Sequence, residues 1–251
     1  MKIWAHRGCS QMYPENTITA FQKAAQIDGL TGIELDIQMT KDNEIVVIHD
    51  ERVDRTTGGI GYVKDFTYLQ IRQLDIESVG SQKEKIPSIV EVLDLLQEDM
   101  KTGLLLNIEL KNSIIPYEKM EDRMLRIIAA RNLQGQVVYS TFYTKSLKKI
   151  RDLETKAAIG VLDTKVSECF YKRNGCFGIS DSIALHPFWK GMDLTKEQLQ
   201  GQTVRAWMTG HLYPEQPTGT RIDLTRLENM GITDVFLNEP EAYISNTGNA
   251  I

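Results

Sequence analysis

The apolar and polar positions of residues 32–50 fit two extended strands joined by a turn. In the first strand, apolar side chains alternate with Glu34 and Asp36, so both acids lie on one face of that strand. A polar turn at 41–43 and a second apolar run then lead to His49. The pattern therefore predicts two neighbouring strands that carry acids and a histidine to one place.

The rest of the chain alternates between short apolar strands and amphipathic helices, about eight times in all. The predicted strands cover residues 2–5, 32–40, 103–111, 137–140, 157–162, 182–186, 203–207 and 234–237. Helices are predicted between and after them, among them 66–74, 117–131, 145–153, 194–199 and 223–230. Several strands are apolar on both faces, as a sheet covered on both sides requires.

This alternation indicates the α/β class and a closed (β/α)8 TIM barrel in a single domain over residues 1–251. A small insertion is expected after the second strand, at about residues 50–86. A doubly wound open sheet is the alternative architecture. It would usually need a glycine-rich phosphate loop after the first strand, and the sequence HRGCSQ is not such a loop.

The composition narrows the class of protein. The 251 residues are 41% hydrophobic and carry a net formal charge of -5, so no basic surface for nucleic acid is expected. No apolar run approaches the ~20 residues of a transmembrane helix. Residues 2–7 contain no long apolar stretch, so no signal peptide is expected. We therefore expect a cytoplasmic protein with no membrane segment, and the sequence does not indicate its oligomeric state.

Polar residues recur where the predicted strands end. In a TIM barrel the chemistry lies at the carboxyl ends of the strands. The polar and aromatic residues expected there are His6, Arg7, Glu34, Asp36, Glu109, Lys111, His186 and Trp207. Two acids on one strand face repel each other, and a divalent cation is the simplest partner that accepts both. The alternative is the solvent-facing side of an edge strand, where two acids cost little.

The same residues carry a family resemblance. The matching motifs are His6-Arg7-Gly8, Pro14-Glu15-Asn16-Thr17, Glu34-Leu35-Asp36, His49-Asp50, Asp54-Arg55-Thr56-Thr57-Gly58 and Glu109-Leu110-Lys111. In order and spacing they resemble the glycerophosphodiester phosphodiesterase family, and the similarity continues through Trp207 and residues 238–240. The resemblance implies a TIM barrel, a divalent cation (Ca²⁺ or Mg²⁺), and hydrolysis of a small glycerophosphodiester to glycerol 3-phosphate and an alcohol.

The acids and histidines have distinct expected roles. Glu34, Asp36 and Glu109 offer an all-oxygen site suited to a hard cation such as Ca²⁺ or Mg²⁺. The alternative for Glu109 is a simple ion pair with a nearby lysine. His6 and His49 are the expected acid/base pair, because an imidazole titrates near neutrality. Their alternative role is helix capping or hydrogen bonding in the core.

Four further residues are expected to contact the substrate. Arg7 and Lys111 would hold phosphate oxygens, Arg7 with two parallel hydrogen bonds. A salt bridge at the rim is the alternative for Arg7. Trp207 would form an apolar wall for the glycerol carbons or pack in the barrel core, and His186 would line the leaving-group side.

Two nearby motifs have competing interpretations. Asp54 could orient a histidine, but the sequence DRTTG is equally typical of a turn. Asn16 could reach the site, although Asn16 or Thr17 also suits the cap of the first helix.

Other functions fit parts of this pattern. A phospholipase D-like enzyme acting on lysophospholipids uses a similar barrel with similar acids and histidines. A barrel that binds a metal or a phosphate without turnover would need the acids and cations alone. The presence of both histidines argues against simple binding, because binding does not require a proton-transfer pair.

Overall fold

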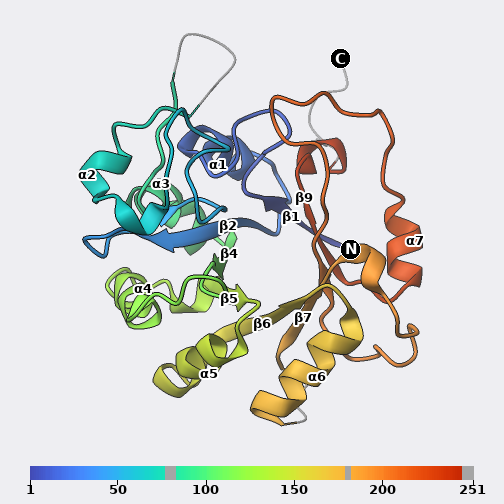
Figure 1. Ribbon diagram of the computed structural model, residues 1–251. Coiled ribbons are helices and arrows are strands. Elements are labelled where there is room, and N and C mark those ends of the chain that lie inside the picture. The colour runs from blue at the N-terminus through green and yellow to red at the C-terminus, as the bar shows by residue number, and fades with distance from the viewer. Residues whose placement is uncertain (77–82, 179–181, 245–251) are drawn as a thin grey trace.

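The computed structural model describes residues 1–76, 83–178 and 182–244. Within these ranges, eight parallel strands form a ring (Figure 1). They are β1 (Lys2–His6), β2 (Gly32–Met39), β4 (Leu105–Leu110), β5 (Val137–Thr141), β6 (Ala158–Asp163), β7 (Ala184–Pro187), β8 (Arg205–Ala206) and β9 (Asp234–Leu237). Backbone bridges from Leu185 to Val204 and from Phe188 to Trp207 join β7 to β8 and close the ring. The predicted TIM barrel is confirmed.

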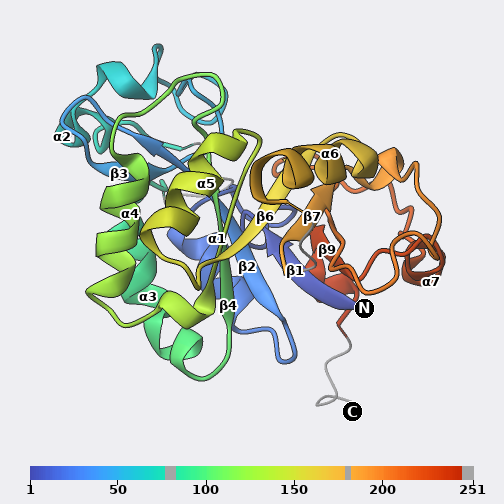
Figure 2. The same ribbon diagram turned by 90° about the horizontal axis from the view of Figure 1, so that it is seen from below.

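Helices surround the strands (Figures 1 and 2). They are α1 (Ile18–Ala25), α2 (Tyr68–Ile71), α3 (Ile89–Lys101), α4 (Met120–Ala129), α5 (Thr144–Leu153), α6 (Val166–Phe177) and α7 (Leu224–Asn229). Four short 3-10 helices are η1 (Val63–Asp65), η2 (Gln134–Gln136), η3 (Trp189–Gly191) and η4 (Pro240–Ala242). In the described parts of the chain, each helix is too short or too polar to cross a membrane.

Hydroxyl side chains cap the first three α-helices. Thr17 accepts a hydrogen bond from the amide of Ala20 and starts α1, so Thr17, not Asn16, is the cap of this helix. Thr67 and Ser88 start α2 and α3, each in a reciprocal capping box. Asn16 is thereby left free for another contact.

The helix predicted over residues 194–199 is wrong. The structure has turns there, and the connection from β7 to β8 is made by η3 and these turns. Leu194 and Leu199 are the segment's only apolar residues, which is too few for an amphipathic face. A short helix without a buried face does not offset its nucleation cost.

The segment after β2 begins with a hairpin strand and then builds its own apolar cluster. β3 (Ile45–Val47) pairs antiparallel with β2, and Figure 2 shows it beside α2. The buried members of the cluster are Val46, Ile48, Val53, Val63, Ile71, Ile76 and Ile86. This packing corresponds to the predicted insertion at 50–86, of which residues 77–82 lie outside the described ranges. It holds the backbone on both sides of His49.

His186 lies inside the barrel in contact with a buried arginine. The Arg205 guanidinium donates to the Asp234 carboxylate at 2.9 Å, and its Nη1 lies 3.1 Å from Nε2 of His186. His186 is fully buried, and β6 can pass its ring only because residue 160 is glycine: a Cβ there would lie 2.2 Å from the ring. Burial, together with the positive charge of Arg205, holds the pKa of His186 well below its usual value.

This burial predicts a loss of stability in mild acid. An unfolded histidine takes up a proton below about pH 6.5, whereas the folded state keeps His186 neutral. The contribution of neutral His186 to the free energy of unfolding is therefore complete above that pH. It is lost as the pH falls, by up to about 1.4 kcal/mol per pH unit. His186→Gln should flatten the pH dependence of the free energy of unfolding in urea between about pH 6.5 and 5.

Partly exposed His211 provides the matched control, since His211→Gln removes an imidazole that is not deeply buried. An unchanged slope in His186→Gln would contradict this account of the buried ring.

Candidate active site

The strand register brings together three carboxylates of β2 and β4, level with the carboxyl end of β1. Asp36 is paired with Glu109 across these strands, and Glu34 is paired with His6 on the other side. One carboxylate oxygen from each of the three acids lies within 4.8 Å of the other two. Since Glu34 and Asp36 are buried, their charges are poorly screened by water.

The turn after β1 has an unusual backbone that places Arg7 beside these acids. Arg7 and Asn16 have left-handed φ angles of 57°, and Gly8 has a φ of 81°. A side chain at residue 8 would collide with the backbone of Ala20 at 2.7 Å, which explains the glycine in the His6-Arg7-Gly8 motif. The amide of Arg7 can then donate to Glu34 at 3.0 Å. A strained backbone of this kind is common at functional sites.

Positive and neutral donors surround the acids. The Nε atom of Arg7 lies 3.3 Å from Asp36, and the Asn16 amide donates to the same carboxylate at 2.9 Å. Lys111 donates to Glu109 at 2.8 Å and lies 3.9 Å from Asp36. The ion pair considered as the alternative role of Glu109 is thus present, but it is one part of a larger cluster.

The three acids fit a divalent cation. Oδ1 of Asp36 is buried without a hydrogen-bond partner. Burial, and then the charges of Asp36 and Glu109, raise the pKa of Glu34 well above its usual value. Burial also acts to raise the pKa of Asp36, but His49, Arg7 and Lys111 outweigh it and lower that pKa. A cation among these oxygens would use the unpartnered atom and offset the repulsion that Glu34 experiences.

Each of the two predicted histidines is oriented through its Nδ1 atom. Nδ1 of His6 lies 2.6 Å from the amide oxygen of Asn238, and Nδ1 of His49 lies 2.6 Å from the carboxylate of Asp50. Their Nε2 atoms face the acid cluster: that of His6 is 3.9 Å from Glu34, and that of His49 is 3.1 Å from Nζ of Lys111. The two histidines therefore flank the same cluster.

Sequence reasoning missed the partner of His49. It considered Asp54, but Asp54 pairs with Arg52 and accepts a hydrogen bond from the amide of Gly61, so the turn interpretation is the one that the structure supports. Asp50 contacts the histidine instead. The signal was its position directly after His49 in the sequence.

Asp50 also begins a chain of alternating charges. Arg55 donates to Asp50 at 2.6 Å and to Glu15 at 2.7 Å. Glu15 in turn accepts a hydrogen bond from Arg7 at 2.8 Å. The chain connects the segment after β3 with the acid cluster, and Arg7 takes part in it as well as in the contacts with the acids.

A cavity of about 340 Å³ lies over the cluster. It is lined by His6, Arg7, His49, Glu109, Lys111, Phe142, Leu162, Trp207, Met208, Thr209, Gly210, Leu212 and Asn238. Trp207 thus faces the cavity while its ring packs on Phe188, with centroids 4.7 Å apart. His186 does not line the cavity, because it is buried in the barrel interior against Arg205. This position does not favour its predicted contact with the leaving group.

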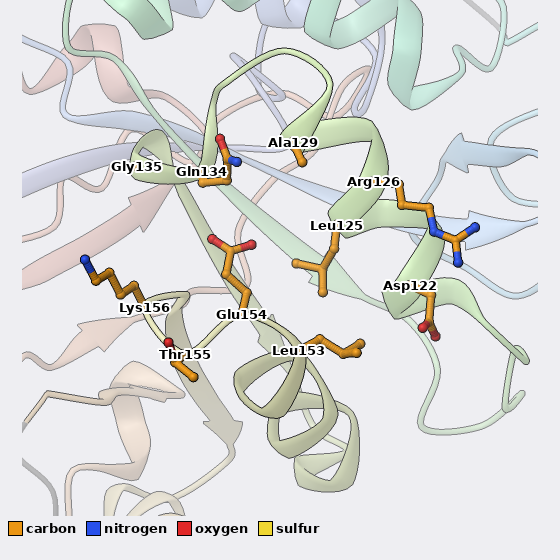
Figure 3. A pocket seen from close by; sticks show the side chains of 10 residues that line it. All are labelled: Asp122, Leu125, Arg126, Ala129, Gln134, Gly135, Leu153, Glu154, Thr155 and Lys156. Carbon is orange, nitrogen blue, oxygen red and sulfur yellow. The ribbon is translucent and has the colours of Figure 1, made fainter.

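A larger hollow of about 750 Å³ lies elsewhere, between α4, α5 and the segments that follow these helices. Figure 3 shows Arg126 and Lys156 on opposite sides of it, with Leu125 and Leu153 between them. Its charged groups do not converge, and none of the predicted site residues lines it. The smaller cavity, where charged and titratable groups meet, is therefore the candidate site.

Comparison with known proteins agrees with this choice. The model of the glycerophosphoryl diester phosphodiesterase family matches residues 6–174, a range that contains both histidines and all three acids. The chain belongs to the glycerophosphoryl diester phosphodiesterase family. A glycerophosphodiester phosphodiesterase of Caldanaerobacter subterraneus is 34% identical over 247 residues, covering 97% of this chain and 96% of the relative. The prediction of an enzyme of the phosphoric diester hydrolase class is confirmed.

Solved structures of the family share the fold. A glycerophosphodiester phosphodiesterase from Thermotoga maritima matches with a TM-score of 0.70 and 25% identity, covering 96% of each chain. A phosphodiesterase from Oleispira antarctica, solved with the product sn-glycerol-3-phosphate, matches with a TM-score of 0.73 and 24% identity. That match covers 96% of this chain and 94% of the other.

The fit of the acid cluster to a cation predicts stabilisation by divalent metal. At about 100 times its dissociation constant, Ca²⁺ or Mg²⁺ should add about 2.7 kcal/mol to the stability of metal-free protein, raising the melting temperature by roughly 5–10 °C. Glu34→Gln should abolish this shift. Because it removes a repelled charge, the variant without metal should be no less stable than the wild type.

Thermal unfolding with and without each metal tests both statements, with exposed Asp94→Asn as the control that keeps the shift. If millimolar divalent cations do not change the melting temperature of the wild-type protein, the metal site is refuted.

Proposed function

We propose that this protein hydrolyses small glycerophosphodiesters to glycerol 3-phosphate and an alcohol, with a bound divalent cation and two histidines that transfer protons. The observation that carries the proposal is the convergence of His6 and His49 on one acid cluster, each with a hydrogen-bonded partner on Nδ1. Binding a metal or an anion requires no such arrangement. Proton transfer does, because each ring must present Nε2 in a fixed direction.

Glu34, Asp36 and Glu109 would hold the cation, for which their oxygen donors suit Ca²⁺ or Mg²⁺. When bound, the cation neutralises charge on the phosphate. Arg7 and Lys111 line the same cavity and would bind the phosphate oxygens. Trp207, which also lines the cavity, would form an apolar wall for the glycerol carbons.

The different partners of the histidines support different roles. Burial, followed by the charge of Arg7, lowers the pKa of His6 to about 3, so its ring is neutral near pH 7 and Nε2 can accept a proton. Nδ1 of His49 instead contacts the carboxylate of Asp50, a charged partner like the one that orients the proton-donating histidine of a catalytic triad. We therefore assign His6 as the base and His49 as the acid of the first step.

In that step, a hydroxyl of the glycerol moiety or a water molecule forms the new phosphorus–oxygen bond. His6 takes the proton of that oxygen. The bond from phosphorus to the leaving alcohol breaks, and His49 gives a proton to the departing oxygen. If the glycerol hydroxyl attacks, the product is a cyclic phosphate, which water opens to glycerol 3-phosphate with the two histidines in exchanged roles.

Removal of either imidazole should suppress turnover without loss of metal binding. We expect His6→Gln and His49→Gln each to lower kcat for release of glycerol 3-phosphate from glycerophosphocholine by about 10²–10⁴-fold. Both variants should keep the rise in melting temperature with divalent cations, because they retain all three acids. EDTA should stop turnover of the wild type.

Turnover near the wild-type rate in both variants would rule out the proton-transfer pair. Full activity in EDTA would rule out the role of the cation while leaving the pair intact.

The leaving group distinguishes the acid from the base. 4-Nitrophenol leaves as an anion and needs little protonation, so the acid matters less for its ester. With the 4-nitrophenyl diester of glycerol phosphate, His49→Gln should lose much less activity than with glycerophosphocholine, whereas His6→Gln should lose about the same with both. The reverse pattern would exchange the two roles.

A further inference from the structure

Asn238 contacts both the His6 ring and a segment of the chain that lines the cavity over the acid cluster. It follows β9, whose last residue Leu237 is paired with Ala5 of β1. Oδ1 of Asn238 lies 2.6 Å from Nδ1 of His6, and its Nδ2 donates to the backbone carbonyl of His211 at 3.0 Å. One side-chain amide therefore connects β9, the imidazole and the segment 208–215.

The carbonyl of His211 fixes which way the Asn238 amide faces. A carbonyl oxygen can only accept a hydrogen bond, so the nitrogen of Asn238 must face His211 and the oxygen must face His6. That oxygen is also an acceptor only, so Nδ1 of His6 must carry the hydrogen. A neutral imidazole has a single N–H. Nε2 of His6 is then the unprotonated atom, as a base requires.

The segment 208–215 is fastened to the turn after β1. The amide of Tyr213 donates to the carbonyl of Ser10 at 2.8 Å, and the side chain of Gln11 donates to the carbonyl of Glu215 at 2.8 Å. Ser10 itself donates through its hydroxyl to the carbonyl of His6 at 2.7 Å. The backbone of His6 and the segment thus share the same turn as an anchor.

The same segment separates two cavities. Met208, Thr209, Gly210 and Leu212 line the cavity over the acid cluster. Gly210 and Leu212 also line a second cavity of about 440 Å³ on the side of Arg55. The position of this segment therefore sets one wall of the candidate active site.

We propose that Asn238 is a positioning residue that holds His6 in the Nδ1–H tautomer and, through the same amide, seats the segment 208–215 as a wall of the cavity. The inference rests on the proposed role of His6 as the base. Loss of the Asn238 amide would then disturb both the His6 ring and the segment 208–215. Asn238 itself acts only by positioning these two groups.

The tautomer can be measured without substrate or metal. In metal-free protein with ¹⁵N-labelled histidine, the ring-nitrogen signals of His6, assigned by their absence in His6→Gln, should show a protonated Nδ1 and an unprotonated Nε2. In Asn238→Leu, which offers no acceptor, these signals should shift toward the Nε2–H tautomer that free imidazole side chains favour. A His6 that keeps the Nδ1–H tautomer in Asn238→Leu would overturn the proposal.

Asn238→Asp separates the two contacts of the amide. Its carboxylate can still accept from Nδ1 of His6 but cannot donate to His211. It should therefore keep the tautomer while backbone amides in 208–215 exchange hydrogen at least severalfold faster. Unchanged hydrogen exchange in Asn238→Asp would overturn the role of the amide in positioning the segment. A retained tautomer in Asn238→Asp would also show that the protein folds with a changed residue 238, so a shift in Asn238→Leu could not be attributed to misfolding alone.

Gln11→Met is the matched control, because it removes the contact with Glu215 and leaves the contacts of Asn238 in place. It should raise KM for glycerophosphocholine severalfold with little change in kcat and no change in the tautomer. Asn238→Leu should lower kcat about tenfold or more and also raise KM. A Gln11→Met variant with the same tautomer shift as Asn238→Leu would refute a specific role of the amide.

Failure of this inference and failure of the proposed function give different results. If His6→Gln retains full turnover, the base assignment fails whatever the tautomer. If His6→Gln is inactive and Asn238→Leu keeps both its tautomer and its kcat, only the role of Asn238 fails.

Discussion

The repulsion among three closely spaced carboxylates at the mouth of the barrel is the constraint on which the rest of the site depends. Glu34 and Asp36 are buried on one strand, and Glu109 lies beside Asp36 on the next. Little water reaches them to screen their charges. The residues around them are accordingly donors or cations, and one buried oxygen of Asp36 still lacks a partner in the described structure. The proposed divalent cation would complete this balance of charge.

The same constraint connects the segment after β2 to the site, although the apolar cluster of this segment is separate from the core of the barrel. Arg7 is shared between the acids and Glu15, and Arg55 extends the alternation of charge to Asp50, which orients His49. The apolar cluster around Val53 and Ile71 holds the backbone that carries this arginine. Packing in the segment is thereby connected to the direction of the His49 ring.

The two histidines lie in different electrostatic settings although both bond through Nδ1. A neutral amide oxygen faces His6, and a carboxylate faces His49. Unequal partners suit the proposed division of the two rings into a base and an acid. Beneath them, His186 is kept neutral by burial beside Arg205. The surroundings therefore decide whether a histidine of this barrel is enclosed in its interior, as His186 is, or faces the cavity, as His6 and His49 do.

The sequence alone was enough to predict the barrel, most strand positions, the three acids on two strands and the two histidines, because alternation of apolar and polar residues is a local property. It considered Asp54 and missed Asp50 as the partner of His49. It also did not identify the partner of His6, because Asn238 lies 232 positions away along the chain. It also placed His186 at the cavity, but the fold buries this residue in the barrel interior against Arg205. Hydrogen-bond partners and burial depend on which strand ends meet when the ring closes, and only the tertiary structure decides that.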